Sequence, residues 1–210
     1  MTAPSAGAVW IGERPLILAS RSAARRQLLA GCGIESELHP ADVDERALEV
    51  EAAAKGALPA VIARLLADAK ARSVSLARRG QYVLGADQVL AIGDRCFAKA
   101  RDRLEAHARL AELTGRSHLL ISASAIARDG ILLYESVETA VMSMRSLKPS
   151  EIETYLDLVA DEALGSVGGY RVEGLGRLLF GRIEADQSII LGLAMSGLFG
   201  FFRSAGLIRL

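Results

Sequence analysis

The sequence of 210 residues is poor in the features on which several classes of protein depend. It has two cysteines, Cys32 and Cys96, and their separation fits neither a disulfide framework nor a zinc site. Lysine plus arginine and aspartate plus glutamate each number 25, so the formal net charge is zero. This balance argues against the broad basic face that polymeric nucleic acid requires. It still allows a local cluster of cations that binds a small anion.

Long apolar runs are also missing. The longest apolar stretch, residues 189–202, is interrupted by glycines and is shorter than the roughly 20 residues of a membrane helix. The N-terminal residues lack the basic start and apolar core of a secretion signal. We therefore expect a cytoplasmic protein without a membrane segment. A flexible lead-in over residues 1–14 and one domain over residues 15–210 are predicted.

Hairpin signals alternate with strand-to-helix turns along the chain. Gly93-Asp94 and Asp129-Gly130 are typical of tight hairpins. Strands are expected over residues 16–19, 82–93 with an interruption at 85–88, 117–128, 131–145, 177–185 and 188–193. Helices are expected after Ser22, over 47–79 with a break near Pro59, over 102–113 and 150–160, and from about 194. This mixture predicts an α/β (mixed α+β) fold with a mixed sheet.

Residues 16–33 form the most informative stretch, with the sequence LILASRSAARRQLLAGCG. An apolar strand enters a serine-rich turn, and Ser22 can cap the helix that follows. The free N–H groups at a helix start attract anions, so this turn with Arg25 and Arg26 suggests a phosphate site. The alternative is an ordinary turn whose arginines are solvated.

Acidic residues occur at two places that suit catalysis. Asp87 follows the small residues Gly85 and Ala86 within an apolar strand, where a charge needs a partner or a cation. It is a candidate general base or metal ligand, or else a structural aspartate. Asp42, Asp44 and Glu45 gather in one loop and offer the oxygen ligands that Mg²⁺ prefers. The alternative for that loop is a solvated acidic surface.

Basic residues and a glycine-rich loop complete the candidates. Lys70 and Lys99, together with Arg25, could neutralise a polyphosphate. Taken singly, each lysine is unremarkable, and the alternative is an ordinary exposed surface residue. Residues 166–176, SVGGYRVEGLG, allow close backbone approach, and Glu173 could contact a ligand or a metal. The alternative is a tight structural turn.

Common catalytic signatures are absent from the sequence. The three histidines are scattered, no G-x-S-x-G nucleophile motif occurs, and no G-x-x-x-x-G-K-[ST] phosphate loop occurs. A serine hydrolase and a P-loop ATPase are therefore not supported.

The order of four segments resembles the Maf family of nucleoside triphosphate pyrophosphatases. They are ASRSAARRQLL (19–29), DVDE (42–45), GADQV (85–89) with Lys99 beyond it, and GGYRVEGLG followed by RIEAD and LGL. The resemblance implies an elongated mixed sheet flanked by helices, with a nucleotide cleft between two lobes. It also implies hydrolysis of nucleoside triphosphates to a monophosphate and diphosphate, a divalent metal (Mg²⁺ or Mn²⁺) and a homodimer. A house-cleaning role, extending to cell-division arrest, is attached to the family.

The resemblance also implies a role for each matched residue. Asp87 matches the family's catalytic acidic residue, which acts as the base that activates water. Asp87 and Glu45 together match the metal site. The substrate-binding positions are matched by Ser20, Arg25, Lys70, Lys99 and Glu173, the last standing where many members have glutamine.

This chain departs from the family pattern at several positions. Ala24 replaces the first arginine of the first motif, and Ser166 replaces a lysine of the glycine-rich loop. Gln88 resembles the branch that acts on modified guanine nucleotides. Because Ala24 and Ser166 each replace a cationic residue of the family pattern, the alternative function is a catalytically weakened regulatory protein that binds nucleotides in the same cleft.

Overall fold

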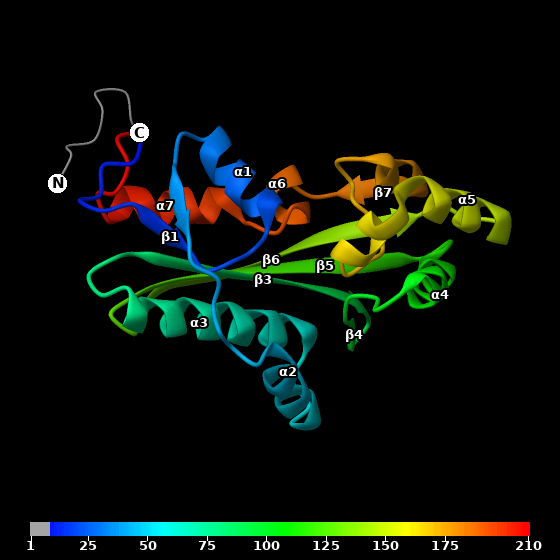
Figure 1. Ribbon diagram of the computed structural model, residues 1–210, viewed down its shortest axis with the longest axis horizontal. Helices are drawn as coiled ribbons and strands as arrows, with labels where there is room; N and C mark the ends of the chain where they lie inside the picture. Colours follow the sequence, from blue (N-terminus) through cyan, green and yellow to red (C-terminus); the bar gives the residue numbers. More distant parts are fainter. Residues whose placement is uncertain (1–8) are drawn as a thin grey trace. The chain divides into compact units, whose positions relative to one another are not determined.

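The computed structural model describes residues 9–210, and these form a mixed seven-stranded sheet (Figure 1). The strands run in the order β2-β1-β3-β5-β6-β7, and β4 pairs with β3. β1 pairs in parallel with β2 and β3, whereas β3–β4 and β6–β7 are antiparallel. The strands are Leu16–Leu18, Ser36–Leu38, Val83–Ile92, Arg95–Phe97, Ser117–Arg128, Ile131–Met144 and Phe180–Glu184, numbered β1 to β7 in chain order. The predicted α/β class with a mixed sheet is confirmed.

The chain divides into two compact units. Unit 1 comprises residues up to 87, 122–138 and 187–210, and unit 2 comprises residues 88–121 and 139–186. β3, β5 and β6 each begin in one unit and end in the other.

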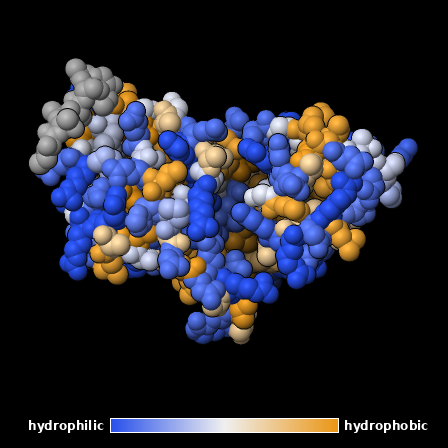
Figure 2. Space-filling view, in the orientation of Figure 1, coloured by the Kyte–Doolittle hydropathy of each residue, from blue (hydrophilic) through white to orange (hydrophobic). Residues whose placement is uncertain are grey.

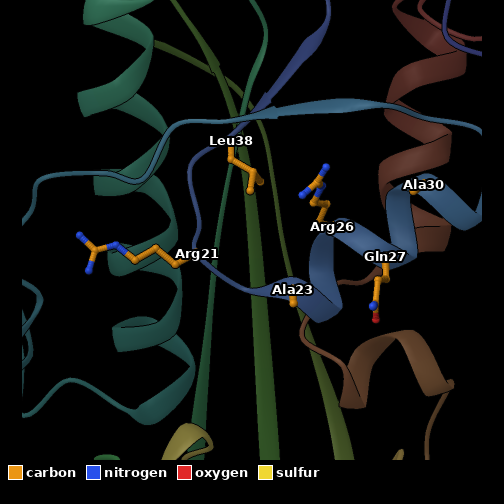
Figure 3. A pocket seen from close by; sticks show the side chains of 6 residues that line it. All are labelled: Arg21, Ala23, Arg26, Gln27, Ala30 and Leu38. Atoms are coloured by element: carbon orange, nitrogen blue, oxygen red, sulfur yellow. The ribbon is translucent and has the colours of Figure 1, made fainter.

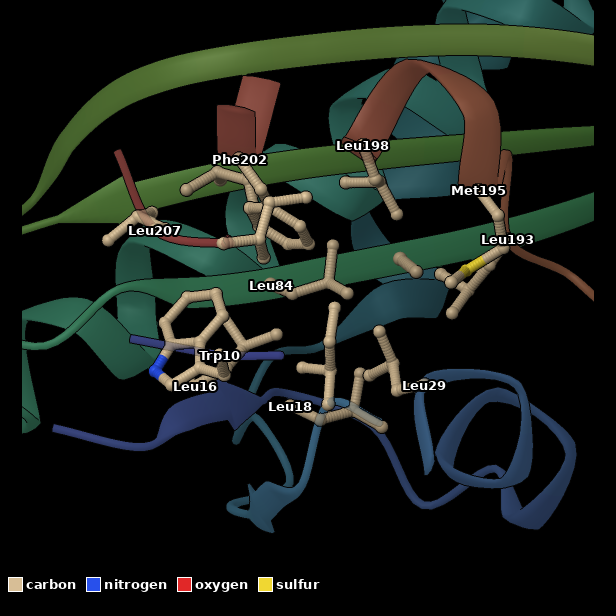
Figure 4. Packing of buried hydrophobic residues seen from close by; sticks show 14 residues of the cluster. Trp10, Leu16, Leu18, Leu29, Leu84, Leu193, Met195, Leu198, Phe202 and Leu207 are labelled. Atoms are coloured by element: carbon tan, nitrogen blue, oxygen red, sulfur yellow. The ribbon is translucent and has the colours of Figure 1, made fainter. Parts of the chain in front are cut away.

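Unit 1 holds a core in which helix α7 (Met195–Ser204) packs its apolar face on the sheet. Leu198 and Phe202 of α7 surround Leu84 of β3, and Trp10 stacks edge-on to Phe202 with 5.3 Å between ring centroids (Figure 4). Residues 1–8 of the predicted lead-in lie outside the described residues, whereas Trp10 is buried in this core. The helices of unit 1 are α1 (Ala23–Gly31), α2 (Glu45–Ala54), α3 (Pro59–Ala77), α6 (Gln187–Ile190) and α7 (Met195–Ser204).

Unit 2 is built around α4 (Arg103–Leu113) and α5 (Pro149–Val159), which contact each other. Two 3₁₀ helices, η1 (Ala160–Gly165) and η2 (Leu175–Leu179), flank the glycine-rich loop.

Hydrophobic residues are interspersed with hydrophilic ones over the face seen in Figure 2. Across residues 9–210, every helix falls short of the length and apolarity needed to cross a bilayer.

Local capping signals in the sequence are realised in the structure. The Ser22 hydroxyl accepts a hydrogen bond from the backbone N–H of Arg25 at 3.3 Å, so α1 begins where the turn predicts. Asp102 caps α4 in the same way, accepting from the Glu105 N–H at 2.8 Å. Such caps satisfy donors that the first helical turn leaves without partners.

Several predicted details of secondary structure are wrong. The strand predicted over 177–185 is confined to Phe180–Glu184, because the residues before it form the 3₁₀ helix η2. The interruption at 85–88 does not exist, because β3 runs unbroken through Gly85 and Asp87. Gly85 serves instead for close packing: a Cβ there would lie 2.2 Å from the Ala67 carbonyl oxygen on α3. The predicted strand at 188–193 is instead the short helix α6 followed by a turn. A short apolar run fits a buried helix as well as a strand, so periodicity alone could not decide.

The close approach of α3 to β3 gives a first prediction. Gly85→Ala is expected to lower the free energy of unfolding by about 1–3 kcal/mol, because its methyl group collides with helix backbone that cannot rotate away. Chemical denaturation followed by circular dichroism measures the change. Gly31→Ala is the matched control, since a Cβ at Gly31 would meet nothing within 4 Å. Equal stabilities of the two variants would contradict the packing argument.

Candidate active site

A buried lysine joins two carboxylates in unit 1. The Nζ atom of Lys70 lies 2.6 Å from Oδ1 of Asp87 and 2.8 Å from Oε2 of Glu45. The side chains of Lys70 and Asp87 are 10% and 11% exposed. Charges so deeply buried are tolerated only when they are paired, and this arrangement pairs them. Residues from α2, α3 and β3 therefore meet at one charged cluster, defined here as the Lys70 cluster.

The acidic loop places Glu45 in this cluster through the start of α2. Asp44 caps α2 by accepting from the Ala47 N–H at 2.9 Å, and Glu45 is the first helical residue. The neighbouring Asp42 is exposed. Of the three predicted acids, Glu45 is the one that the structure pairs with Lys70.

Glu49 is a nearby carboxylate that the sequence reasoning missed. It follows Glu45 by one helical turn on α2, so the two side chains share a face. Burial raises the pKa of Glu49, and the negative charges of Asp87 and Glu45 raise it further, whereas Lys70 lowers it. The spacing of the two glutamates was the signal that could have found it.

Arg25 ties the turn between β1 and α1 to the strand that carries Asp87. Its Nη1 donates to Oγ of Ser20 at 3.1 Å and to the carbonyl oxygen of Ala86 at 2.8 Å. Its Nε donates to the carbonyl oxygen of Gly192 at 3.0 Å. Burial lowers the pKa of Arg25, and the negative charge of Asp87 opposes that shift. The predicted phosphate turn and the predicted base are thus linked through adjacent residues.

Arg26 lies on another side of α1. It lines a surface hollow of about 340 Å³ beside β2, and Figure 3 shows its side chain near Leu38. Arg25 is not among the residues that line this hollow, so the two arginines of the motif lie in different environments. The hollow is lined by Arg21, Ala23, Arg26, Gln27, Ala30 and Leu38.

The candidate residues divide between the two units. Ser20, Arg25, Lys70, Asp87 and Glu45 lie together in unit 1. The structure places the remaining two in unit 2, where Lys99 is exposed between β4 and α4, and Glu173 accepts from Arg171 at 2.9 Å. Contact with a substrate stays a prediction for all of them.

The glycine-rich loop of unit 2 is anchored by a buried tyrosine. The hydroxyl of Tyr170 and Nε2 of His118 on β5 are 2.5 Å apart, and both residues pack against Phe180. The Tyr170 N–H donates to Oγ of Ser166 at 2.9 Å. A Cβ at Gly168 would lie 2.2 Å from the Tyr170 ring, so this loop needs glycine there. Ser166, which replaces the family's lysine, thus shapes the loop.

Burial of His118 makes the stability of the protein depend on pH. Its pKa is lowered from 6.5 to about 4 by burial, so the unfolded chain binds a proton first as the pH falls. This contribution to stability is complete above pH 6.5 and is lost towards about pH 4. The difference in free energy of unfolding between wild type and His118→Asn should be about 2 kcal/mol smaller at pH 5 than at pH 7.5. Urea unfolding at both pH values measures it, and the variant cancels the titration of other groups. An advantage that does not change with pH would contradict the prediction.

The acidic side chains of the described residues do not form a dedicated metal cage. Within residues 9–210, no group of three or more His, Cys, Asp or Glu side chains is arranged to hold an ion. A metal that is shared with phosphate needs only one or two carboxylates, because phosphate oxygens and water complete its coordination. Asp87 and Glu45 form a pair of hard oxygen donors that fits this second kind of site.

Comparisons with known proteins agree on one family over nearly the whole chain. The model of a family described as Maf-like protein matches residues 15–205. A nucleoside triphosphate pyrophosphatase of Rhodopseudomonas palustris is 50% identical over 95% of this chain and 98% of its own. One of the same name from Bradyrhizobium diazoefficiens is 47% identical, with the same coverage. A 7-methyl-GTP pyrophosphatase of Mesorhizobium japonicum is 45% identical over 92% of this chain and 97% of its own.

Proposed function

This chain belongs to the Maf-like protein family, and on that premise we propose that it is a nucleoside triphosphate pyrophosphatase. It hydrolyses a nucleoside triphosphate to a nucleoside monophosphate and diphosphate. The observation that carries the proposal is the Lys70 cluster, in which two carboxylates lie beside a turn suited to phosphate. Sequence identities of 47% and 50% to pyrophosphatases, over nearly the full length of the chain, support the same activity.

The reaction requires in-line attack of water on phosphorus, which cleaves the link between the α and β phosphates. Asp87 is the proposed general base that accepts a proton from the attacking water, while the phosphorus–oxygen bond to diphosphate breaks. Ser20, Arg25 and the free N–H groups at the start of α1 orient the phosphates. Lys70 supplies positive charge between Asp87 and Glu45, and Lys99 and Glu173 are the proposed contacts from unit 2.

We further propose that the enzyme uses a divalent cation, Mg²⁺ or Mn²⁺. Asp87 and Glu45 would hold it, because their oxygens are the hard ligands that such cations prefer. When bound, the cation would neutralise phosphate charge and make water more acidic. Lys70 pairs with the same two carboxylates, so metal and lysine compete for them unless the phosphates draw the lysine away.

The proposed substrate class includes canonical and base-modified nucleoside triphosphates, in keeping with a house-cleaning role. Gln88 and the 7-methyl-GTP pyrophosphatase among the relatives favour a modified guanine base, whereas the other relatives carry the general name. A restraint on cell division would be a downstream effect of this activity.

A cytoplasmic homodimer is the proposed form of the protein. Several large apolar side chains are exposed in unit 2, among them Leu104, Leu158 and Leu178 at 78%, 67% and 67% exposure, and burial against a second copy would remove them from water. Size-exclusion chromatography with light scattering should give twice the 22.3 kDa mass of one chain. A mass of one chain at micromolar concentration would contradict the dimer.

Release of pyrophosphate from a panel of triphosphates tests the proposed function. The purified chain is incubated with canonical and base-modified nucleotides in Mg²⁺ or Mn²⁺, and pyrophosphate and orthophosphate are assayed separately. Pyrophosphate without orthophosphate is expected, and chelation of the metal should abolish it. Calorimetric binding of nucleotides with no pyrophosphate release would instead support the regulatory nucleotide-binding protein, which Ala24 and Ser166 suggest.

A further inference from the structure

Arg109 of α4 connects two distant segments of unit 2. Its Nη1 donates to the carbonyl oxygen of Ala98 at 2.8 Å and to that of Val167 at 2.7 Å. Ala98 immediately precedes Lys99, and Val167 opens the glycine-rich loop that carries Glu173. One nitrogen atom therefore joins the backbones of the two segments that hold the substrate-binding candidates of this unit.

The surroundings of Arg109 fix its guanidinium in place. The group lies over the ring of Phe97, with 4.6 Å from Cζ to the ring centroid, and the side chain is half-buried. Both of its acceptors are neutral carbonyl groups rather than carboxylates. A planar guanidinium suits such bridging, because its donors have fixed directions and can stack on an aromatic ring at the same time. Its hydrogen bonds thus set backbone position, whereas Glu112 and Glu105 act on its charge through coulombic attraction.

We propose that Arg109 is a positioning residue that holds the Lys99 segment and the glycine-rich loop in the arrangement that binds nucleotide. This inference rests on the proposed function for its substrate. Arg109 does not need to touch the nucleotide, since it acts through the backbone on either side.

A second anchor separates this role from general support of the loop. Tyr170 holds the middle of the glycine-rich loop to His118 on β5, independently of Arg109. Loss of Arg109 should therefore release the link between the two segments while the buried Tyr170 contact remains. The expected effect is weaker nucleotide binding without loss of the fold.

The test compares Arg109→Gln with Arg103→Gln. Glutamine is too short to span both carbonyl groups, so KM for the triphosphate should rise about tenfold or more with little change in kcat. Hydrogen exchange should quicken together in residues 98–101 and 166–169. Arg103 lies on the same helix but pairs with Glu153 and Asp157 at the surface, so its variant should change neither readout. Combined with Lys99→Ala and Glu173→Ala, Arg109→Gln should add little further increase in KM, because it acts through the two segments that carry these residues.

Several outcomes would overturn the proposal. Unchanged exchange in either segment would show that Arg109 does not bridge them, and faster exchange with an unchanged KM would show that the bridge does not serve binding. If Arg109→Gln fails to fold, Arg109→Lys replaces it, and its ammonium group should protect one segment but not both. If the wild type releases no pyrophosphate, the proposed function fails, whereas the exchange measurement still decides whether the bridge exists.

Discussion

Asp87→Asn is expected to lower pyrophosphate release by about 10²- to 10⁴-fold, the range of a lost general base. Asparagine has the shape of aspartate, and its Oδ1 can still accept the hydrogen bond from Lys70, which keeps Glu45 as a charged partner. Its amide cannot take a proton from water. Circular dichroism and cooperative unfolding should therefore remain those of a folded protein while turnover falls to background.

Asp42→Asn provides the matched control for this variant. Asp42 is an exposed acid of the loop before α2 and lies outside the Lys70 cluster, so its turnover should stay within a factor of about two of wild type. Initial rates of pyrophosphate release, measured with saturating triphosphate and metal, give the comparison. Retained turnover in Asp87→Asn would remove Asp87 from its role as the base, although the family assignment would stand.

Lys70→Met is expected to lower the free energy of unfolding by about 3–5 kcal/mol at pH 8, because it leaves buried Asp87 with an uncompensated negative charge. Methionine retains most of the apolar stem, so lost packing contributes little. Activity should fall as well, since the cluster loses its positive charge. Chemical denaturation at constant pH measures the change in stability.

Two controls isolate the charge as the cause. Lys55→Met removes an exposed lysine that lies 2.5 Å from Glu51 on α2, and it should leave the free energy of unfolding close to that of wild type, because water screens this surface pair. The double variant Lys70→Met/Asp87→Asn removes both buried charges, and it should recover much of the lost stability. If the double variant is as unstable as the sum of its single changes, Lys70 and Asp87 are not energetically coupled.

Local signals in the sequence were sufficient for most of the fold. Ser22 predicted the start of α1, and Gly93-Asp94 and Asp129-Gly130 predicted two hairpins, because caps and tight turns depend on a few adjacent residues. Gly85 misled the same reasoning. A glycine in a strand pattern signals either a break or a close approach, and only the position of α3 decides between them.

The site was predictable in its residue types but not in its contacts. The family motifs selected Asp87, Glu45 and Lys70 separately, and nothing in their spacing required one ammonium group to join both carboxylates. Arg109 and Glu49 were missed because their importance comes from tertiary neighbours. A carbonyl group such as that of Val167 leaves no trace in the sequence, so backbone acceptors cannot be read from it.

The burial of Trp10 has a spectroscopic consequence. The chain has one tryptophan, and it lies in the core of unit 1, with its indole N–H donating to the carbonyl oxygen of Arg14 at 2.9 Å. Tryptophan fluorescence therefore follows the integrity of unit 1 alone. Tyr155 and Tyr170 belong to unit 2, whose unfolding leaves the emission of Trp10 untouched if that unit opens by itself. Comparing the emission with circular dichroism, which averages both units, thus distinguishes stepwise from concerted unfolding without an introduced label.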